Sequence, residues 1–155
     1  MIVIHKPTID DYDAVRALVA QVHALHRAAR GDVYAADAHF SREYYAALLA
    51  DENGFPIAAY DDDKLVGFAS AFMKPANPNP AMLPHRIAYI DDICVHSRCR
   101  GMGIGTLLYN ETVRLARERG ADTLMLTVWA FNEGAMRFYK GLGMTERNIN
   151  MEMKL

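Results

Sequence analysis

The chain has 155 residues and a formal net charge of −2 at neutral pH, a length that suits one domain with a buried core. This near-neutral charge argues against nucleic acid or an anionic membrane as a bulk electrostatic partner. No early apolar run is long enough for a secretory signal or a membrane span, so we expect a cytoplasmic protein. Cys94 and Cys99 give no disulfide framework, and we expect both to be thiols.

Hydrophobic periodicity and turn residues divide the chain into helices and strands. In chain order, we predict a strand at Val3-Ile4, a helix from Thr8 to about Arg30, a helix from Ser41 to Asp51, strands Ile57–Tyr60 and Leu65–Met73 joined as a hairpin, a proline-rich loop Pro75–Pro84, a strand Arg86–Val95, a helix Ile104–Arg119, a strand Thr123–Trp129, a helix from Asn132 and an edge strand Arg147–Lys154. This order predicts one α/β domain over residues 1–155 with a mixed sheet.

The most informative segment runs from Arg100 to Gly105, between the predicted strand Arg86–Val95 and the helix that follows it. Its three glycines alternate with apolar residues, so backbone amides can converge where a helix N-terminus adds the positive end of its dipole. The segment therefore predicts a phosphate-binding loop, although a turn with a tight helix–strand contact would also require glycines. The glycine spacing differs from a dinucleotide fingerprint, and the chain has no Gly-Lys-Ser/Thr of a nucleoside-triphosphate loop.

The pattern that the segment does fit is Arg/Gln-x-x-Gly-x-Gly/Ala, with Arg100, Gly103 and Gly105 at the fixed positions. Further on, residues 132–144 are similar to Asn-x-x-Ala-x-x-Phe-Tyr-x-x-x-Gly-Phe, with Met144 in place of the last aromatic residue. On these two motifs the chain resembles the GNAT superfamily of acyl-CoA-dependent N-acyltransferases, from about Ala58 onward. The resemblance implies a mostly antiparallel sheet flanked by helices, acetyl-CoA as co-substrate and direct acetyl transfer to a primary amine.

The resemblance also implies a cofactor site. The loop amides are expected to hold the CoA pyrophosphate, the end of the preceding strand is expected to pair with the pantetheine arm, and a later asparagine is expected to help hold that arm. The expected cofactor-binding residues are Ile93, Val95, Arg100, Gly101, Met102, Gly103, Ile104, Gly105, Thr106 and Asn132.

Tyr139 is the expected general acid, because the resemblance places a recurrent tyrosine of the superfamily there. A phenol can donate a proton to the departing thiolate and can sit at the edge of a pocket. Helical spacing with Ala135 and Leu142 leaves a second interpretation open, in which Tyr139 is an ordinary core aromatic residue.

Asp91 and Asp92 interrupt an otherwise apolar strand. Successive side chains of a strand point to opposite faces, so at least one carboxylate should face the core or a cleft and need a partner. The local sequence is similar to a strand of diamine acetyltransferases, which implies Asp91 as the base, acting directly or through water, and Asp92 as a substrate-orienting residue. A structural carboxylate, bonded to an amide or an arginine, is the alternative.

We expect no metal, because His23 and His26 share a helix face without further ligands at metal-binding spacing. They and Arg27 could instead line the acceptor pocket. The acceptor remains open between a polyamine-like molecule, an amino-acid-like molecule and a protein N-terminus or lysine. A non-catalytic acyl-CoA-binding module is the alternative from another class, and a homodimer stays open.

Overall fold

The computed structural model describes residues 1–155. Its elements are β1 (Ile2–His5), the 3-10 turn η1 (Ile9–Asp11), α1 (Tyr12–Ala29), α2 (Arg42–Ala50), β2 (Ile57–Asp61), β3 (Lys64–Met73), β4 (Ile87–Val95), the 3-10 turn η2 (Ser97–Cys99), α3 (Ile104–Glu118), β5 (Thr123–Met125) and α4 (Glu133–Gly141). The strands form one sheet in the order β1-β2-β3-β4-β5, in which only β4 and β5 are parallel. The predicted mixed, mostly antiparallel α/β fold is confirmed.

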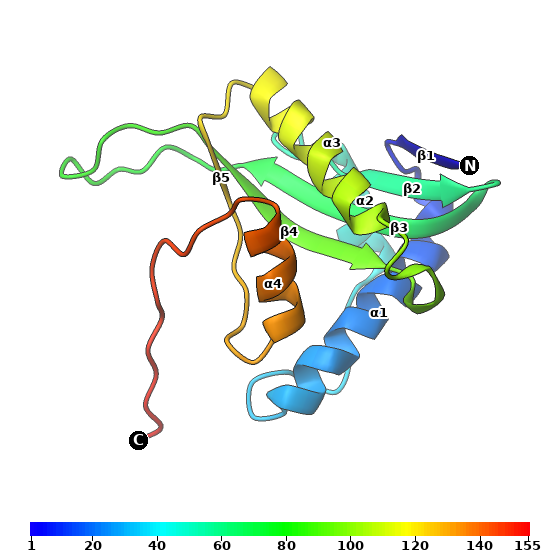
Figure 1. Ribbon diagram of the computed structural model, residues 1–155, viewed down its shortest axis with the longest axis horizontal. Helices are drawn as coiled ribbons and strands as arrows, with labels where there is room; N and C mark the ends of the chain where they lie inside the picture. The colour runs from blue at the N-terminus through cyan, green and yellow to red at the C-terminus, as the bar shows by residue number, and fades with distance from the viewer.

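Helices cover both faces of the sheet (Figure 1). On one face, α1 and α2 pack on the strands through a cluster that includes Val15, Tyr45 and Phe68. On the other face, α3 and α4 pack through two further clusters. There α3 approaches the sheet closely, since a Cβ at Gly67 would lie 2.9 Å from Leu108 Cδ1. No helix has the length and hydropathy of a membrane-spanning segment.

Polar side chains cap the first turns of α2 and α4. Ser41 Oγ accepts a backbone amide of α2 at 3.0 Å, and Asn132 Oδ1 accepts one of α4 at 3.1 Å. Such bonds satisfy amides that have no partner within the helix. Thr8, however, precedes the 3-10 turn η1, so α1 begins only at Tyr12.

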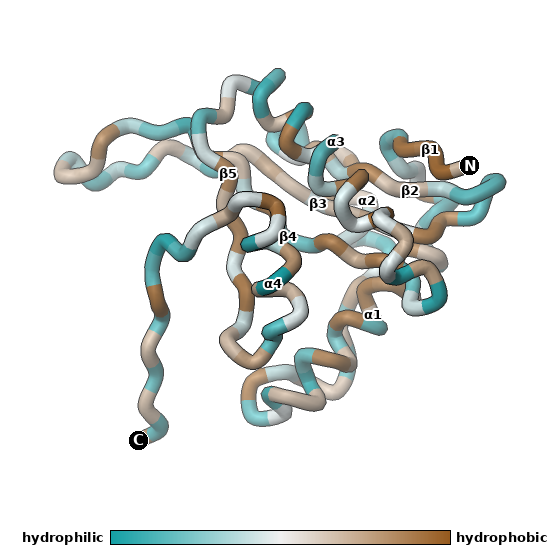
Figure 2. Tube along the Cα trace, in the orientation of Figure 1, coloured by the Kyte–Doolittle hydropathy of each residue, from teal (hydrophilic) through white to brown (hydrophobic).

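Two predicted strands differ in the structure. The strand expected over 123–129 pairs only at Thr123–Met125, because the chain then leaves β4. The edge strand expected over 147–154 does not form: residues 145–155 are exposed and lie outside every strand. In Figure 1 this red C-terminal tail runs away from α4, and in Figure 2 its residues alternate between hydrophilic and hydrophobic. The alternation of polar and apolar residues therefore identified a segment that could form a strand. It did not show whether the chain supplies a partner strand.

Candidate active site

The centre of the candidate site is an opening in the sheet between β4 and β5. The two strands pair only at the start of β4, from Ile87 with Thr123 to Tyr89 with Met125. Beyond this point β4 continues to Val95 with β3 as its sole strand partner. The structure thus puts Ile93 and Val95 on the half of β4 whose second edge is free, where an extended ligand can add backbone hydrogen bonds.

The glycine loop that follows β4 presents a row of unpaired backbone donors. None of the seven amides from Arg100 to Thr106 makes a hydrogen bond, and the first paired amide is that of Leu107, on the Gly103 carbonyl at 3.1 Å. Gly101 and Gly103 have φ of +75° and +80°, and a Cβ on either would meet nothing within 4 Å. Positive φ turns the chain so that it leads into the N-terminus of α3, where donors and dipole together favour an anion.

Gly105 differs from its two neighbours in the loop. A Cβ there would lie 3.2 Å from Phe138 Cζ, on α4. Its lack of a side chain therefore lets α3 and α4 approach each other, in addition to exposing its amide. Arg100 lies in the same loop and is exposed, with its Nε donating to the Val95 carbonyl at 3.3 Å.

The two acidic residues of β4 share one face of the sheet, contrary to the expected alternation. Ser70 pairs with Asp92 and Ala71 pairs with Ile90, so Asp91 is the extra residue of a β-bulge. A bulge breaks the two-residue alternation of side chains at that point. Both carboxylates consequently influence Tyr44, on α2. Burial and the two negative charges raise the pKa of Tyr44.

Neither carboxylate has a counter-charge. Asp91 and Asp92 make no side-chain hydrogen bond and no salt bridge. Burial raises the pKa of both, and the neighbouring charge of Asp91 helps to bring the pKa of Asp92 to about 6. Asp92 is the deeper of the two, while Asp91 is exposed at the surface of the bulge. The arrangement suits a cation from outside the chain and leaves Asp92 able to exchange a proton near neutral pH.

Tyr139 stands on α4 beside the opening. Its ring packs against the cluster of α3 and α4, with its centroid 6.3 Å from that of Tyr109. Its hydroxyl makes no hydrogen bond. Burial and the proximity of Cys94, Asp92 and Tyr109 raise the pKa of Tyr139, so the phenol keeps its proton. The residue is thus both a packed aromatic and a free donor, which combines the two interpretations from sequence.

A cavity of about 370 Å³ lies between α2 and the sheet, next to the bulge. Tyr44, Asp51, Ser70 and Asp91 are its polar lining residues. Ser70 is 4% exposed, and its Oγ is buried without any hydrogen-bond partner, which is rare because an unmet buried hydroxyl is unfavourable. Sequence reasoning missed Tyr44, Asp51 and Ser70, and no spacing in the sequence linked them to the acidic pair.

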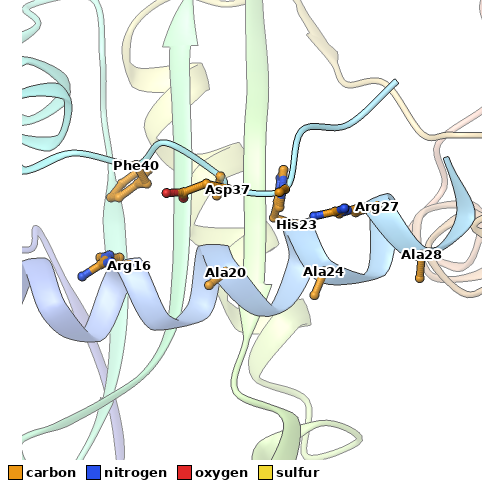
Figure 3. A pocket seen from close by; sticks show the side chains of 10 residues that line it. Arg16, Ala20, His23, Ala24, Arg27, Ala28, Asp37 and Phe40 are labelled. Carbon is orange, nitrogen blue, oxygen red and sulfur yellow. The ribbon is translucent and has the colours of Figure 1, made fainter. Parts of the chain in front are cut away.

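A second hollow, of about 760 Å³, follows α1 (Figure 3). Arg16, His23, Arg27 and Asp37 give it a mixed polar lining. It includes no residue of the glycine loop and none of the acidic pair.

The two histidines of α1 contact the segment that follows this helix. His23 donates from Nε2 to the Ala35 carbonyl at 2.8 Å, and the His26 ring stacks on Tyr34 with 5.2 Å between centroids. No group of three or more potential ligands gathers into a metal site. The side-chain oxygen of Asn132 caps α4, which leaves its amide nitrogen free for a ligand.

Comparison with known proteins gives consistent results. A sequence model of the acetyltransferase (GNAT) family matches residues 19–144, which confirms the resemblance. An uncharacterised N-acetyltransferase of Methanocaldococcus jannaschii is 34% identical over 111 residues, covering 71% of this chain and 47% of that protein. A thialysine N-epsilon-acetyltransferase of Bos taurus is 38% identical over 58 residues, or 37% of this chain and 34% of that protein. The chain thus matches less than half the length of these relatives.

Among solved structures, a mutant of the BH1408 protein of Bacillus halodurans superposes with a TM-score of 0.94 at 29% identity, over 99% of each chain.

Proposed function

Because the chain belongs to the acetyltransferase (GNAT) family, we propose that it transfers the acetyl group of acetyl-CoA directly to a primary amine that arrives positively charged. The observation that carries the proposal is a pair of regions flanking one opening: seven unpaired amides on the glycine loop and two carboxylates without a counter-charge on β4. The first suits the phosphates of the donor, and the second suits the ammonium group of the acceptor.

The loop fits CoA phosphates by both charge and space. Its amides are donors without partners, and the side of Gly101 and Gly103 on which a Cβ would stand is empty. Ile93 and Val95 would hold the pantetheine arm along the free edge of β4, with Met102, Ile104, Gly105 and Thr106 completing the loop and Arg100 adding charge. When bound, acetyl-CoA supplies the thioester.

Two groups of the chain can move the protons that transfer requires. An ammonium must lose a proton before its nitrogen can attack, and the departing sulfur must gain one. Asp92, with a pKa of about 6, suits the first task better than Asp91, the base that the sequence suggested, because it is deeper and influences Tyr139. Tyr139 suits the second task, because its protonated hydroxyl has no other partner. No nucleophilic residue is required, and Cys94 is buried.

Asp91 then takes the role of binding the acceptor. It lines the cavity with Tyr44, Asp51 and Ser70, a set of acceptor and hydroxyl oxygens that fits a second ammonium. Asp91 lies in the bulge two residues before Ile93, so the two positions are at most roughly 7 Å apart along the strand. A linear diamine of about that length could place one nitrogen at the opening and the other in the cavity. This supports the polyamine-like acceptor over a peptide or an amino acid.

The test is a CoA-release assay with acetyl-CoA and matched amines. Putrescine and n-butylamine share a four-carbon chain but differ in the second nitrogen. We expect release with both and a kcat/KM for putrescine at least about tenfold higher, a difference typical of one charge-assisted contact. Asp91→Asn should remove most of that preference, whereas Asp63→Asn, in the exposed β2–β3 turn, should keep it.

Each other outcome has a defined meaning. Tight acetyl-CoA binding without release on any amine would favour the non-catalytic binding module. Release with equal kcat/KM for the two amines would mean that the cavity does not bind a second ammonium. Acetylation of amines in general would then remain. Release on lysine-containing peptides alone would point to a protein acceptor.

A further inference from the structure

The hollow beside α1 is the larger of the two cavities described above, at about 760 Å³, a size typical of a ligand site. One side of it is a row of α1 residues at the i, i+4, i+7 and i+11 positions of one helix face: Arg16, Ala20, His23 and Arg27. The other side is the segment 36–40, which Figure 3 shows running alongside the helix. The hollow is therefore a groove that follows the axis of α1.

Two exposed arginines stand near the ends of this groove without a counter-charge. Neither Arg16 nor Arg27 makes an ion pair or a side-chain hydrogen bond, whereas Arg30, just after α1, pairs with Asp32 at 2.9 Å. In Figure 3 the two side chains lie at opposite ends of the row, with the alanines between them. Guanidinium groups of this kind bind carboxylates through two parallel hydrogen bonds.

Asp37 is the only acidic residue that lines the groove. Its Oδ1 accepts the His39 amide at 2.9 Å, and this hydrogen bond, with the positive charges of His39, Arg16 and His23, lowers its pKa. One carboxylate against two arginines leaves the groove with a surplus of positive charge. The groove therefore suits an anionic partner, in contrast to the acidic cavity that the proposed function gives to an ammonium group.

The segment across from α1 offers free backbone groups to a partner. Residues 36–38 lie outside every helix and strand, and none of their amides or carbonyls makes a hydrogen bond. His23 holds this segment to α1, since its Nε2 donates to the Ala35 carbonyl at 2.8 Å. A fixed stretch of unpaired backbone is what an extended peptide needs in order to add hydrogen bonds along its length.

We propose that the groove docks an extended acidic peptide of a partner protein, with two carboxylates four residues apart. Arg27 follows Arg16 by 11 residues, which is a rise of about 16 Å along the helix. Residues i and i+4 of an extended peptide lie about 13 Å apart on one face, so each carboxylate can reach one of the long arginine side chains. Residue i+2 faces the same way and meets the alanines, so an apolar side chain suits it.

The length of the groove and its backbone identify a peptide as the occupant. A small dianion such as succinate cannot reach across about 16 Å, and it has no amides or carbonyls to pair with residues 36–38. The inference is independent of the acetyl-transfer proposal, because the groove includes no residue of the glycine loop and neither Asp91 nor Asp92.

The first experiment is calorimetry on the full chain with the peptide Glu-Ser-Leu-Ser-Glu, blocked at both ends so that only its side chains are charged. We expect saturable binding of this peptide and none of Lys-Ser-Leu-Ser-Lys. Affinity should fall at least about tenfold as salt rises from about 0.01 M to about 0.15 M, since both ion pairs are exposed to solvent.

The second experiment reverses or removes single charges. Arg27→Glu should weaken binding of the acidic peptide at least about tenfold. Arg117→Glu, the matched control, makes the same change at an exposed arginine of α3 outside the groove and should keep the affinity. Asp37→Asn removes the one negative charge but keeps an oxygen for the His39 amide, so it should strengthen binding a few-fold.

The third experiment fills the groove. Ala24→Trp puts a large ring between the two arginines and should abolish binding of the acidic peptide. Ala17→Trp, the matched control, makes the same change at an exposed position of α1 that does not line the groove, and it should bind like the wild type.

Three results would overturn the proposal: equal binding of the acidic and basic peptides, equal losses for Arg27→Glu and Arg117→Glu, or displacement of the peptide by an equimolar amount of succinate, which would make the groove a site for a small dianion. A thermal melt of each variant shows that it is folded, and Arg27→Gln replaces Arg27→Glu if that variant is not.

Discussion

The glycine loop and the acidic bulge are close in the sequence and opposite in chemistry. The loop, residues 100–106, holds backbone donors without acceptors, while Asp91 and Asp92 hold acceptors without donors. Each region would be satisfied by a ligand of the opposite charge. Under the proposed function, the fold presents two half-sites to one opening: backbone amides for the anionic donor and side-chain carboxylates for the cationic acceptor.

The two regions also differ in what they cost the fold. The loop is largely exposed, so water can hydrogen-bond its amides. The unpaired donors therefore destabilise the fold little. Asp92 is largely withdrawn from water, and its raised pKa shows that its charge is disfavoured in the folded state. Variants of the acidic region should therefore affect stability as well as function.

The largest expected effect is at Tyr139, the proposed general acid, which lies near Asp92. Tyr139→Phe keeps the ring but removes the proton donor, and turnover should fall on the order of ten- to a thousandfold with acetyl-CoA affinity unchanged. Tyr109→Phe is the matched control, because it makes the same change in a buried neighbouring ring. Equal losses in steady-state turnover for both variants would make Tyr139 a packing residue.

The next effect concerns Asp92 and separates function from stability. Asp92→Asn should lower turnover on the order of a hundredfold and abolish the rise in wild-type rate with pH through about 6. The folded wild type binds the Asp92 proton more tightly than the unfolded chain does. The free energy of unfolding therefore falls as pH rises from 3.8 to about 6.

In consequence, Asp92→Asn should be more stable than wild type at pH 8, by up to about 3 kcal/mol, and should lose that advantage near pH 4. Urea unfolding at the two pH values measures the difference. A variant less stable at both pH values would mean that the carboxylate has a partner in the folded state.

A smaller effect should separate the loop from the acidic region. Gly103→Ala places a Cβ where the chain has no atoms but where a bound phosphate would be, and acetyl-CoA affinity should fall about tenfold by calorimetry. Gly143→Ala is the control: its φ is +91° and its Cβ would also meet nothing, so both variants carry similar strain of about 1 kcal/mol. Weakened binding in both would trace the loss to strain instead of to the phosphate.

The smallest expected effect is at Ser70. Ser70→Ala removes a buried hydroxyl without a partner, so the free energy of unfolding should stay constant or rise by up to about 1 kcal/mol. If the cavity binds a second ammonium, the same variant should raise the KM for putrescine a few-fold and leave that for n-butylamine unchanged. A clear loss of stability would show that Ser70 has a hydrogen bond in the folded protein.

Patterns that depend on neighbours along the chain were predicted well. The helices after Ser41 and from Asn132 begin where expected, and the β2–β3 hairpin forms at the predicted turn. The predictions that failed depended on a partner strand. Thr123–Trp129 is β-prone throughout, but only three of its residues pair with β4. The alternating C-terminal tail pairs with no strand of its own chain.

The candidate site divides in the same way. The motifs located Tyr139 and the glycine loop, but they could not distinguish Gly105, which meets Phe138, from Gly103, which meets nothing. The strand sequence located both acids, yet strict alternation put them on opposite faces, and only the bulge opposite Ser70 brings them to one.

The sequence by itself determined the order of the elements, the family and the segments that carry the donors and the acids, because capping, periodicity and motif spacing act between residues near one another in the chain. Tertiary structure alone decided the opening between β4 and β5, the shared face of Asp91 and Asp92, the unpaired Ser70 and the solitary tail. Each of these depends on which segments pair and in which register, and on the loss of water that follows, and such contacts join residues that are distant in sequence.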